Sequence, residues 1–242
     1  MDTTTIKALR VIEALAASDE PCGVAELGRA LGLTKSNTFR ILSTLTEQGY
    51  VRSQGDSGRY SLTLRIWEHG TKVIDRHPIR RVALPHMRIL HGHVEETVLL
   101  SALEVKDVLY IGKVESENPV RASARVGNRA PAWKTASGLS MLAYQPDEFI
   151  QQVVQSLSAQ DADVSVLMQA LDDVRKRGFA ASINGTRIGV NSVAAPIWSG
   201  SHAPRVAISV SGPAERFSPE RMDELGILVL NCATRVSESL GV

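Results

Sequence analysis

The segment from Gly32 to Val51, GLTKSNTFRILSTLTEQGYV, constrains the fold of this chain more than any other part of the sequence. Its apolar residues recur at helical spacing and Thr34 is a suitable N-cap, so the segment predicts a helix that runs to about Gln48. Just before it, the spacing of VAELGRAL predicts a two-turn helix that Gly32 ends. Two helices joined by a tight, glycine-containing turn are typical of the helix-turn-helix motif.

Flanking segments extend this motif on both sides. Apolar residues at helical spacing from Ile6 to Leu15 predict a first helix that ends near Ser18. After Gly49, the sequence YVRSQGDSGRYSL predicts two short strands joined by a Gly-Asp-Ser-Gly turn. Three helices followed by a β-hairpin indicate a winged helix-turn-helix domain, which we assign to residues 1–62.

The third predicted helix has an apolar side and a polar first turn, as a DNA-recognition helix needs. We expect Phe39, Leu42 and Leu45 to be buried against the first two helices, while the polar first turn enters the major groove. Arginines of the wing are expected to contact the DNA backbone or the minor groove. The predicted DNA-binding residues are Lys35, Ser36, Asn37, Thr38, Arg40, Arg52 and Arg59. The alternative is a three-helix protein-interaction module with a solvated polar face.

Charge and hydropathy narrow the class of protein. The net charge of +1 excludes a globally basic nucleic-acid coat, but residues 24–65 contain six Lys and Arg against three Asp and Glu. No window reaches the roughly 18 apolar residues that a membrane span needs, and the N-terminus lacks the pattern of a signal peptide. We therefore expect a soluble, cytoplasmic protein. Cys22 and Cys232 match no metal or redox spacing, so we expect small, buried, unpaired side chains.

Residues beyond the wing predict a second domain. Apolar residues from Ser61 to about Thr71 indicate a helix, interrupted near Pro78, that links the domains. A helix is predicted from about Pro85, followed by the strands TVLLSALE, VLYIGKVES and PVRASARVG. A helix-rich middle, the strands FAASI, VNSVAAPI and RVAISVSG, and a last helix follow. This order predicts an α+β domain, with a linker helix at 63–79 and the second domain at 80–242.

Two strands and one helix start suggest a binding site. In RVAISVS, Ser209 and Ser211 share a face without bulky groups, and Ser192 lies on a similar face of VNSVAAPI. Such a face either lines a ligand cavity or faces solvent. If Thr135 or Ser137 opens a helix, the free backbone amides there present a positive helix end to an anion such as a carboxylate.

Taken together, these segments resemble the IclR family of bacterial transcription regulators. The resemblance covers almost the whole chain and includes SNTFRILSTLTEQGYV, GRYSLTLRIWEHG, HVEETVLLSAL, VLYIGKVES, VGNRAPAWKTASGLSMLAY, GFAASINGTRIGVNSVAAPI and VAISVSGP. It implies a winged helix-turn-helix, a linker helix and a GAF-like effector-binding domain. It also implies a homodimer or tetramer that binds double-stranded operator DNA, often as a repressor, with no cofactor.

The resemblance favours the ligand cavity over a solvent-facing sheet. It implies a small effector, which we expect to be a carboxylic acid, held by loop amides and by serine side chains. The expected effector-binding residues are Trp133, Ala136, Ser137, Ser182, Ser192, Ser209 and Ser211. For Trp133, a purely structural role as an aromatic anchor is the alternative. Several positions depart from the family pattern: Leu139 stands where lysine is usual, Gly185 where glutamate is usual, and Trp198 and Ser199 replace the customary aromatic-acid end.

An enzymatic second domain is the alternative reading. The sequence contains no nucleophile elbow, phosphate loop or zinc-binding motif. Its richest cluster, HMRILHGHVEE, offers His86, His91, His93, Glu95 and Glu96 for a metal, but a metal site there requires ligands from elsewhere. We therefore expect a transcription regulator of a catabolic operon whose DNA binding is switched by a small organic acid, and no catalytic activity.

Overall fold

The computed structural model describes residues 2–157 and 163–242. The chain divides into two compact units, residues 1–75 and 76–242, and each is described here by itself. Within the described residues, no helix is both long enough and apolar enough to cross a membrane. Cys22 and Cys232 are buried and unpaired, as expected.

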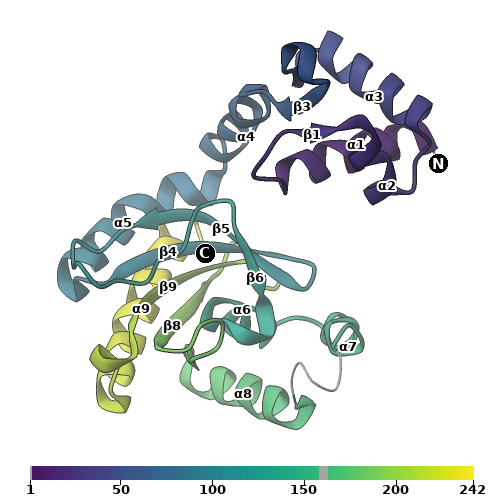
Figure 1. The fold of residues 1–242 in the computed structure, drawn as a ribbon. Coiled ribbons are helices and arrows are strands. Elements are labelled where there is room, and N and C mark those ends of the chain that lie inside the picture. Colours follow the sequence, from purple (N-terminus) through teal and green to yellow (C-terminus); the bar gives the residue numbers. More distant parts are fainter. Residues whose placement is uncertain (1, 158–162) are drawn as a thin grey trace. The chain divides into compact units, whose positions relative to one another are not determined.

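The N-terminal unit is a winged helix-turn-helix, as predicted (Figure 1). Its helices and strands are α1 (Thr3–Ala16), β1 (Cys22–Gly23), α2 (Val24–Leu31), α3 (Lys35–Glu47), β2 (Val51–Ser53) and β3 (Arg59–Leu62). The strands form an antiparallel sheet in the order β1-β3-β2. Its core joins the three helices to the hairpin through Val11, Leu27, Leu42, Val51 and Tyr60.

Local chemistry explains the turn between α2 and α3. Gly32 ends α2 in the left-handed conformation with φ 67°, which a residue with a side chain adopts at a cost. Thr34 then starts α3, and its side chain accepts a hydrogen bond from the amide of Asn37 at 3.3 Å. These two features end α2 and start α3 within three residues, as the tight turn of a helix-turn-helix motif requires.

Two helices follow the wing. Helix α4 (Arg65–Asp75) buries none of its residues, and α5 (Pro78–Val94) follows it. The prediction that a helix starts near Pro85 was wrong, because α5 starts at Pro78 and contains Pro85. Pro78 suits the first position, where no amide donor is needed, and Pro85 lies on the exposed side, where water can hydrogen-bond the carbonyl that it leaves free. The boundaries at 62 and 79 stay predictions.

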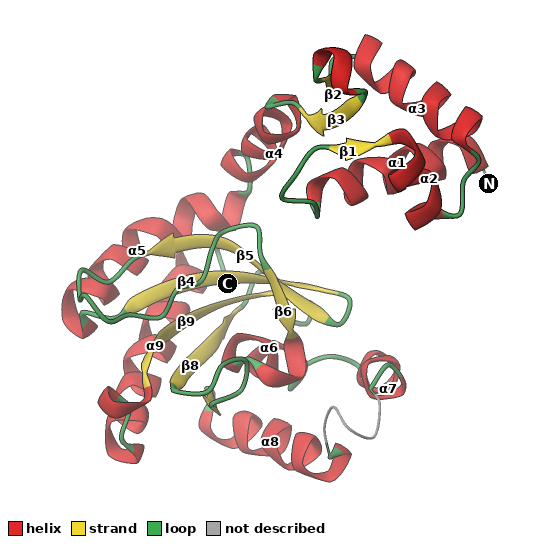
Figure 2. Cartoon of the chain, in the orientation of Figure 1, coloured by secondary structure: helices red, strands yellow, loops and turns green. Residues whose placement is uncertain are grey.

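The C-terminal unit is built on an antiparallel sheet with strand order β6-β5-β4-β9-β8-β7. The strands are β4 (Thr97–Glu104), β5 (Asp107–Val114), β6 (Arg129–Pro131), β7 (Ala180–Ile183), β8 (Val190–Ile197) and β9 (Val206–Pro213). Helices α5 and α9 (Pro219–Ser239) pack together and against the sheet, whereas α6 (Ala136–Leu142) and α8 (Val164–Arg177) lie at its other face (Figure 2). Helix α7 (Asp147–Gln155) joins the second group. The α+β class is confirmed.

One predicted strand is absent. The segment PVRASARVG, residues 119–127, forms no strand, and β6 pairs with β5 in its place. Side chains fix the first part of this segment, since Thr97 Oγ1 donates to the carbonyl of Ala122 at 3.4 Å and Arg216 Nη2 donates to that of Val120 at 3.0 Å; at its end the amide of Gly127 donates to the carbonyl of Tyr110 at 2.8 Å. The segment between β5 and β6 therefore crosses a face of the sheet instead of extending its edge.

Candidate functional site

The first turn of α3 presents polar groups to solvent. Lys35, Ser36 and Arg40 are exposed and Asn37 is half-buried. None of the charged groups among them forms an ion pair within the described part of the chain. This surface matches the predicted leading edge of a recognition helix.

Two residues of α3 lie opposite to their predicted positions. The buried stripe of α3 consists of Thr38, Ile41, Leu42 and Leu45, which recur at i, i+3, i+4 and i+7. Thr38 is fully buried, and its Oγ1 donates to the carbonyl of Thr34 at 3.0 Å, so the prediction that Thr38 contacts DNA was wrong. Phe39 follows it by about 100° around the helix and is 55% exposed, so its predicted burial was wrong as well.

The two arginines of the wing differ in how firmly the protein itself holds their side chains. Arg52 is exposed on β2, and its Nε donates to Ser61 Oγ on β3 at 3.1 Å. Arg59 is held within the unit, since its Nε donates to the carbonyl of Pro21 at 2.6 Å and its Nη2 lies 3.3 Å from Glu26 Oε2. Arg59, which follows the hairpin turn, thus fixes that end of the hairpin to the start of α2. Of the two, Arg52 is more available to a phosphate.

Six of the seven predicted effector-binding residues line one cavity in the C-terminal unit, which we call the inner cavity. They are Ala136, Ser137, Ser182, Ser192, Ser209 and Ser211. Antiparallel pairing brings the strand residues together: Ser192 is opposite Ser211, and Ser209 is opposite Ala194 on one side and Leu99 on the other. Ser209 and Ser211 are buried, which excludes the solvent-facing alternative for this side of β9.

Backbone donors face the same space. Thr135 is the N-cap of α6, and its Oγ1 accepts from the amide of Gly138 at 3.0 Å. Among the described residues, no acceptor is bonded to the amides of Ala136 and Ser137, although both residues are buried. Buried amides without a partner are costly, so an acceptor in the cavity would be stabilised there.

The inner cavity is narrow as it stands. Its volume of about 30 Å³ holds one or two water molecules. Ser182 Oγ donates to the carbonyl of Lys134 at 2.8 Å, and a Cβ at Gly185 would lie 2.0 Å from that carbonyl oxygen. Glycine at 185 is therefore required by this close approach. Leu139, which also departs from the family pattern, packs in the core. An organic ligand is larger than this space, so it requires the hydrogen bond between Ser182 and Lys134 to open.

A larger space, the outer cavity, continues from the inner one and has a volume of about 380 Å³. Both are lined by Leu99, Tyr110, Lys134 and Ser211. The outer cavity adds Arg125, Arg129 and Arg187, none of which was predicted. Burial raises the pKa of Tyr110, and the nearby Arg187 charge opposes that rise.

Trp133 is outside both cavities. It packs against the hydrophobic core of α6, α7 and α8, and its Nε1 is buried without a partner among the described residues. The predicted role of Trp133 in effector binding is thereby corrected to its alternative, an aromatic anchor. Trp133 lies in the short helical turn Ala132–Lys134 before α6, and in this turn it is Lys134, not Trp133, that lines the cavity.

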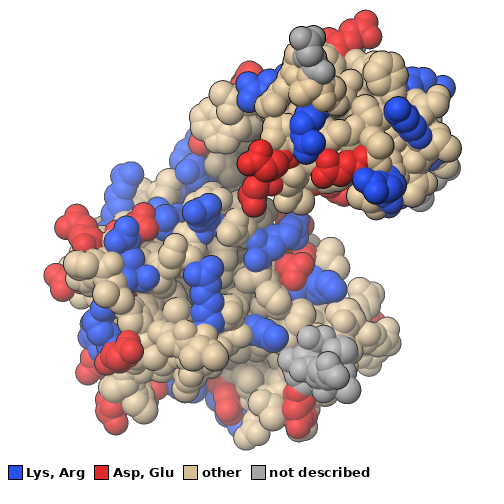
Figure 3. Space-filling view, viewed as in Figure 1, with Lys and Arg blue, Asp and Glu red and all other residues tan. Residues whose placement is uncertain are grey.

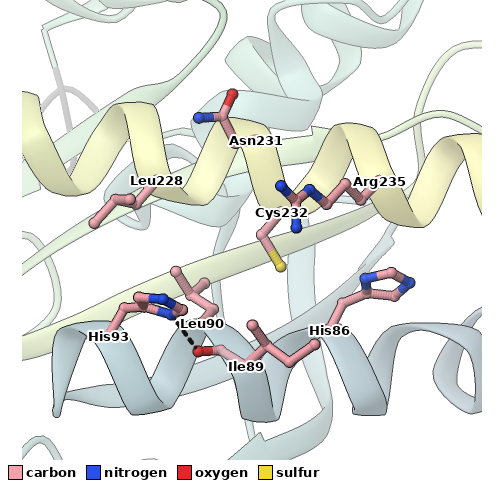
Figure 4. Close-up of a pocket in the computed structure, with 8 residues that line it drawn as sticks. All are labelled: His86, Ile89, Leu90, His93, Leu228, Asn231, Cys232 and Arg235. Carbon is pink, nitrogen blue, oxygen red and sulfur yellow. Dashed lines mark hydrogen bonds between the residues drawn. The ribbon is translucent and has the colours of Figure 1, made fainter.

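A further groove, between α5 and α9, contains two of the histidines considered for a metal (Figure 4). His86 and His93 lie on either side of Cys232, whose pKa burial raises to about 11. His93 Nδ1 is 2.7 Å from the carbonyl of Ile89, and His86 Nε2 is 3.3 Å from Ser239 Oγ. The described residues contain no group of three or more His, Cys, Asp or Glu that could hold a metal ion.

Comparison with known families assigns both units. Residues 4–55 match the family described as "IclR helix-turn-helix domain", and residues 71–238 match "Bacterial transcriptional regulator IclR C-terminal". These matches agree with the two units of the fold.

Individual proteins extend the similarity over the whole chain. The chain is 29% identical to the HTH-type transcriptional regulator KdgR of Escherichia coli, over 99% of this chain and 93% of that protein. It is 31% identical to the glycerol operon regulatory protein of Streptomyces coelicolor, over 97% and 95%. Its fold is similar, with a TM-score of 0.82 and 23% identity over 99% of each chain, to an IclR homolog from Microbacterium hydrocarbonoxydans that was solved in complex with 4-hydroxybenzoate.

Proposed function

The chain belongs to the IclR family of bacterial transcriptional regulators, and on that premise we propose that a small organic acid, held in its C-terminal unit, switches its binding to the operator of a catabolic operon. It is a DNA-binding regulator. The observation that carries the proposal is the inner cavity, where serine hydroxyls and two free backbone amides surround one space. Serine hydroxyls also donate hydrogen bonds, so this donor set suits a carboxylate.

On the DNA side, we assign base contacts to the first turn of α3. Lys35, Ser36 and Asn37 lead into the groove, and Arg40 reaches a guanine edge or a phosphate. Phe39, exposed on the same helix, suits an apolar contact with a thymine methyl group. Arg52 contacts the backbone from the wing, and Arg59 acts mainly by holding the wing in place.

On the effector side, we assign the carboxylate to the amides of Ala136 and Ser137. Ser192, Ser209 and Ser211 hydrogen-bond the rest of the molecule. Ser182 must first release the carbonyl of Lys134, so binding is coupled to movement of the segment that contains Ser182 and Gly185. The fold accommodates an organic acid in the Microbacterium protein, but the argument for this chain comes from its own cavity.

We further propose a homodimer or tetramer, in which the effector acts on the arrangement of two subunits. An effector shifts DNA binding only through its different affinity for the two arrangements. The C-terminal unit binds its ligand without turning it over, and a regulator that reads bacterial operators works in the cytoplasm.

A thermal-shift screen with the full-length protein tests the effector proposal. The panel contains oxo acids, hydroxybenzoates and sugar acids, and a ligand at 100 times its dissociation constant stabilises the native state by about 2.7 kcal/mol. We expect one chemical class to shift the melting temperature. Ser209→Leu, which fills the inner cavity, removes the shift and the operator response, whereas Ser209→Ala keeps the space and weakens binding only. An undiminished response in Ser209→Leu would locate the effector elsewhere.

A further inference from the structure

The outer cavity is surrounded by positive charge. Arg125, Arg129 and Lys134 come from the stretch that runs through β6 toward α6, Arg187 comes from the loop between β7 and β8, and all four line it. Among the described residues that line the inner and outer cavities, none is Asp or Glu. Figure 3 shows Lys and Arg side chains over the centre of one face of the C-terminal unit, with Asp and Glu mainly towards its edges.

Within the described residues, these four cationic groups have no ion-pair partner. Other cations of this unit do pair: Arg121 with Glu115, Arg175 with Asp172, and Arg216 with Glu96. By contrast, the described part of the chain supplies no ion pair and no side-chain hydrogen bond to the four around the outer cavity. Like charges around one hollow repel each other, so the arrangement favours an anion that enters it.

The wall that carries Arg125 is held in place. Arg216 Nη2 donates to Glu96 Oε2 at 2.8 Å and to the carbonyl of Val120 at 3.0 Å, and Glu96 is buried. At the same end, Ser116 Oγ donates to the carbonyl of Glu95 at 2.7 Å. The segment between β5 and β6 is thus fixed to the start of β4, and it forms one wall of the hollow that Tyr110 and Arg187 also line.

We propose that the effector carries two anionic groups, one carboxylate in the inner cavity and a second carboxylate or phosphate in the outer cavity between Arg125, Arg129 and Arg187. This inference rests on the proposed function, since it assigns a second subsite to the same ligand. Lys134 and Tyr110 line both cavities, so one molecule extends from one to the other. Arginine suits the second group because its guanidinium binds carboxylates and phosphates through paired hydrogen bonds.

Calorimetric titration of the full-length protein with matched compounds tests the inference. The pairs are terephthalate and 4-hydroxybenzoate, adipate and hexanoate, and 6-phosphogluconate and gluconate; in each pair the first compound adds one anionic group. We expect the doubly anionic member of the accepted pair to bind about tenfold more tightly, and this preference to shrink at high ionic strength. If only 6-phosphogluconate binds more tightly than its partner, the second group is a phosphate. If terephthalate or adipate binds more tightly than its partner, the second group is a carboxylate.

Arginine variants localise the effect. Arg187→Gln and the double variant Arg125→Gln with Arg129→Gln should lower affinity for the doubly anionic compound about tenfold and for its partner less than twofold. Arg88→Gln, an exposed position on α5 outside both cavities, is the matched control and should bind both as the parent does. Circular dichroism verifies that each variant is folded.

The outcomes separate this inference from the proposed function. Equal binding of both members of a pair, with no effect of the arginine variants, overturns the second subsite and leaves the carboxylate effector standing. Failure of every compound to bind overturns both. A loss of operator affinity in the arginine variants without any ligand would assign the cluster to DNA phosphates and also overturn the second subsite.

Discussion

At the scale of single residues, Arg40 provides the clearest test of the DNA interface. It is exposed on α3, one position past the aromatic Phe39 and close to the polar first turn. Arg40→Ala should weaken operator binding by about 1–3 kcal/mol and relax specificity if Arg40 reads a base. If it contacts a phosphate instead, affinity should fall for all sequences alike and the salt dependence should decrease. Fluorescence anisotropy with operator and scrambled DNA distinguishes the two.

Thr38→Val is the control on the same helix. Thr38 is fully buried and its hydroxyl donates to the carbonyl of Thr34, the N-cap of α3, so the operator affinity of this variant should stay close to that of the parent. A marked loss of affinity at unchanged stability would return Thr38 to the DNA interface. An unchanged binding curve for Arg40→Ala would remove Arg40 from it.

At the scale of helices and strands, periodicity predicted most of the architecture. Strands β4 and β8 coincide with TVLLSALE and VNSVAAPI, and β9 lies one residue beyond RVAISVSG, because a run of about eight mostly apolar or small residues between turn signals favours a buried strand. The buried side of α3 was assigned less well. A polar Thr38 on the core side and an aromatic Phe39 on the outer side contradict simple hydropathy, since Thr38 satisfies its hydroxyl inside the helix.

The candidate site was predictable only where local sequence determines it. The serines of β8 and β9 share a face by strand alternation, and the α6 amides follow from the Thr135 cap. The outer cavity depends instead on where a segment without regular structure crosses the sheet, and residues distant in sequence meet there. Trp133 was misassigned for a similar reason: only tertiary packing decides which side of a short helical turn faces the core.

The turn between α2 and α3 yields a test at this scale. Gly32 has φ 67° and nothing lies within 4 Å of a Cβ built there, so Gly32→Ala is opposed by backbone conformation alone. The free energy of unfolding of the N-terminal unit should fall by about 1–2 kcal/mol. Gly70→Ala, in the middle of α4 with equally open surroundings and an ordinary φ, should raise it by about 0.4–1 kcal/mol. Scanning calorimetry measures both, and equal effects would contradict the assignment of strain to Gly32.

At the scale of the whole molecule, α4 exposes an apolar side, although Arg65 and His69 on it contact Gln48 and Tyr50 of the same unit. Helix α4 buries none of its residues. Two large apolar side chains are therefore open to solvent: Leu64, just before the helix, is 81% exposed and Trp67, within it, is 69% exposed. Leu64, Trp67, Thr71 and Ile74 recur with the three-then-four spacing of a coiled-coil seam. This surface is the basis for the proposed dimer, because a second α4 with the same seam would cover it.

Trp67→Glu should therefore convert the proposed dimer to a monomer, since it would introduce two like charges into the seam. Two linked DNA-binding units gain about 10²–10⁴ in affinity over one, so binding to an operator with two half-sites should fall by a factor in that range while binding to a single half-site is retained. Sedimentation velocity gives the stoichiometry and anisotropy gives both affinities. Lys72→Ala changes α4 outside the seam, where Lys72 pairs with Glu68, and should remain dimeric. A Trp67→Glu protein that stays dimeric would mean that subunits associate through the C-terminal unit instead, and the effector would then act on that interface.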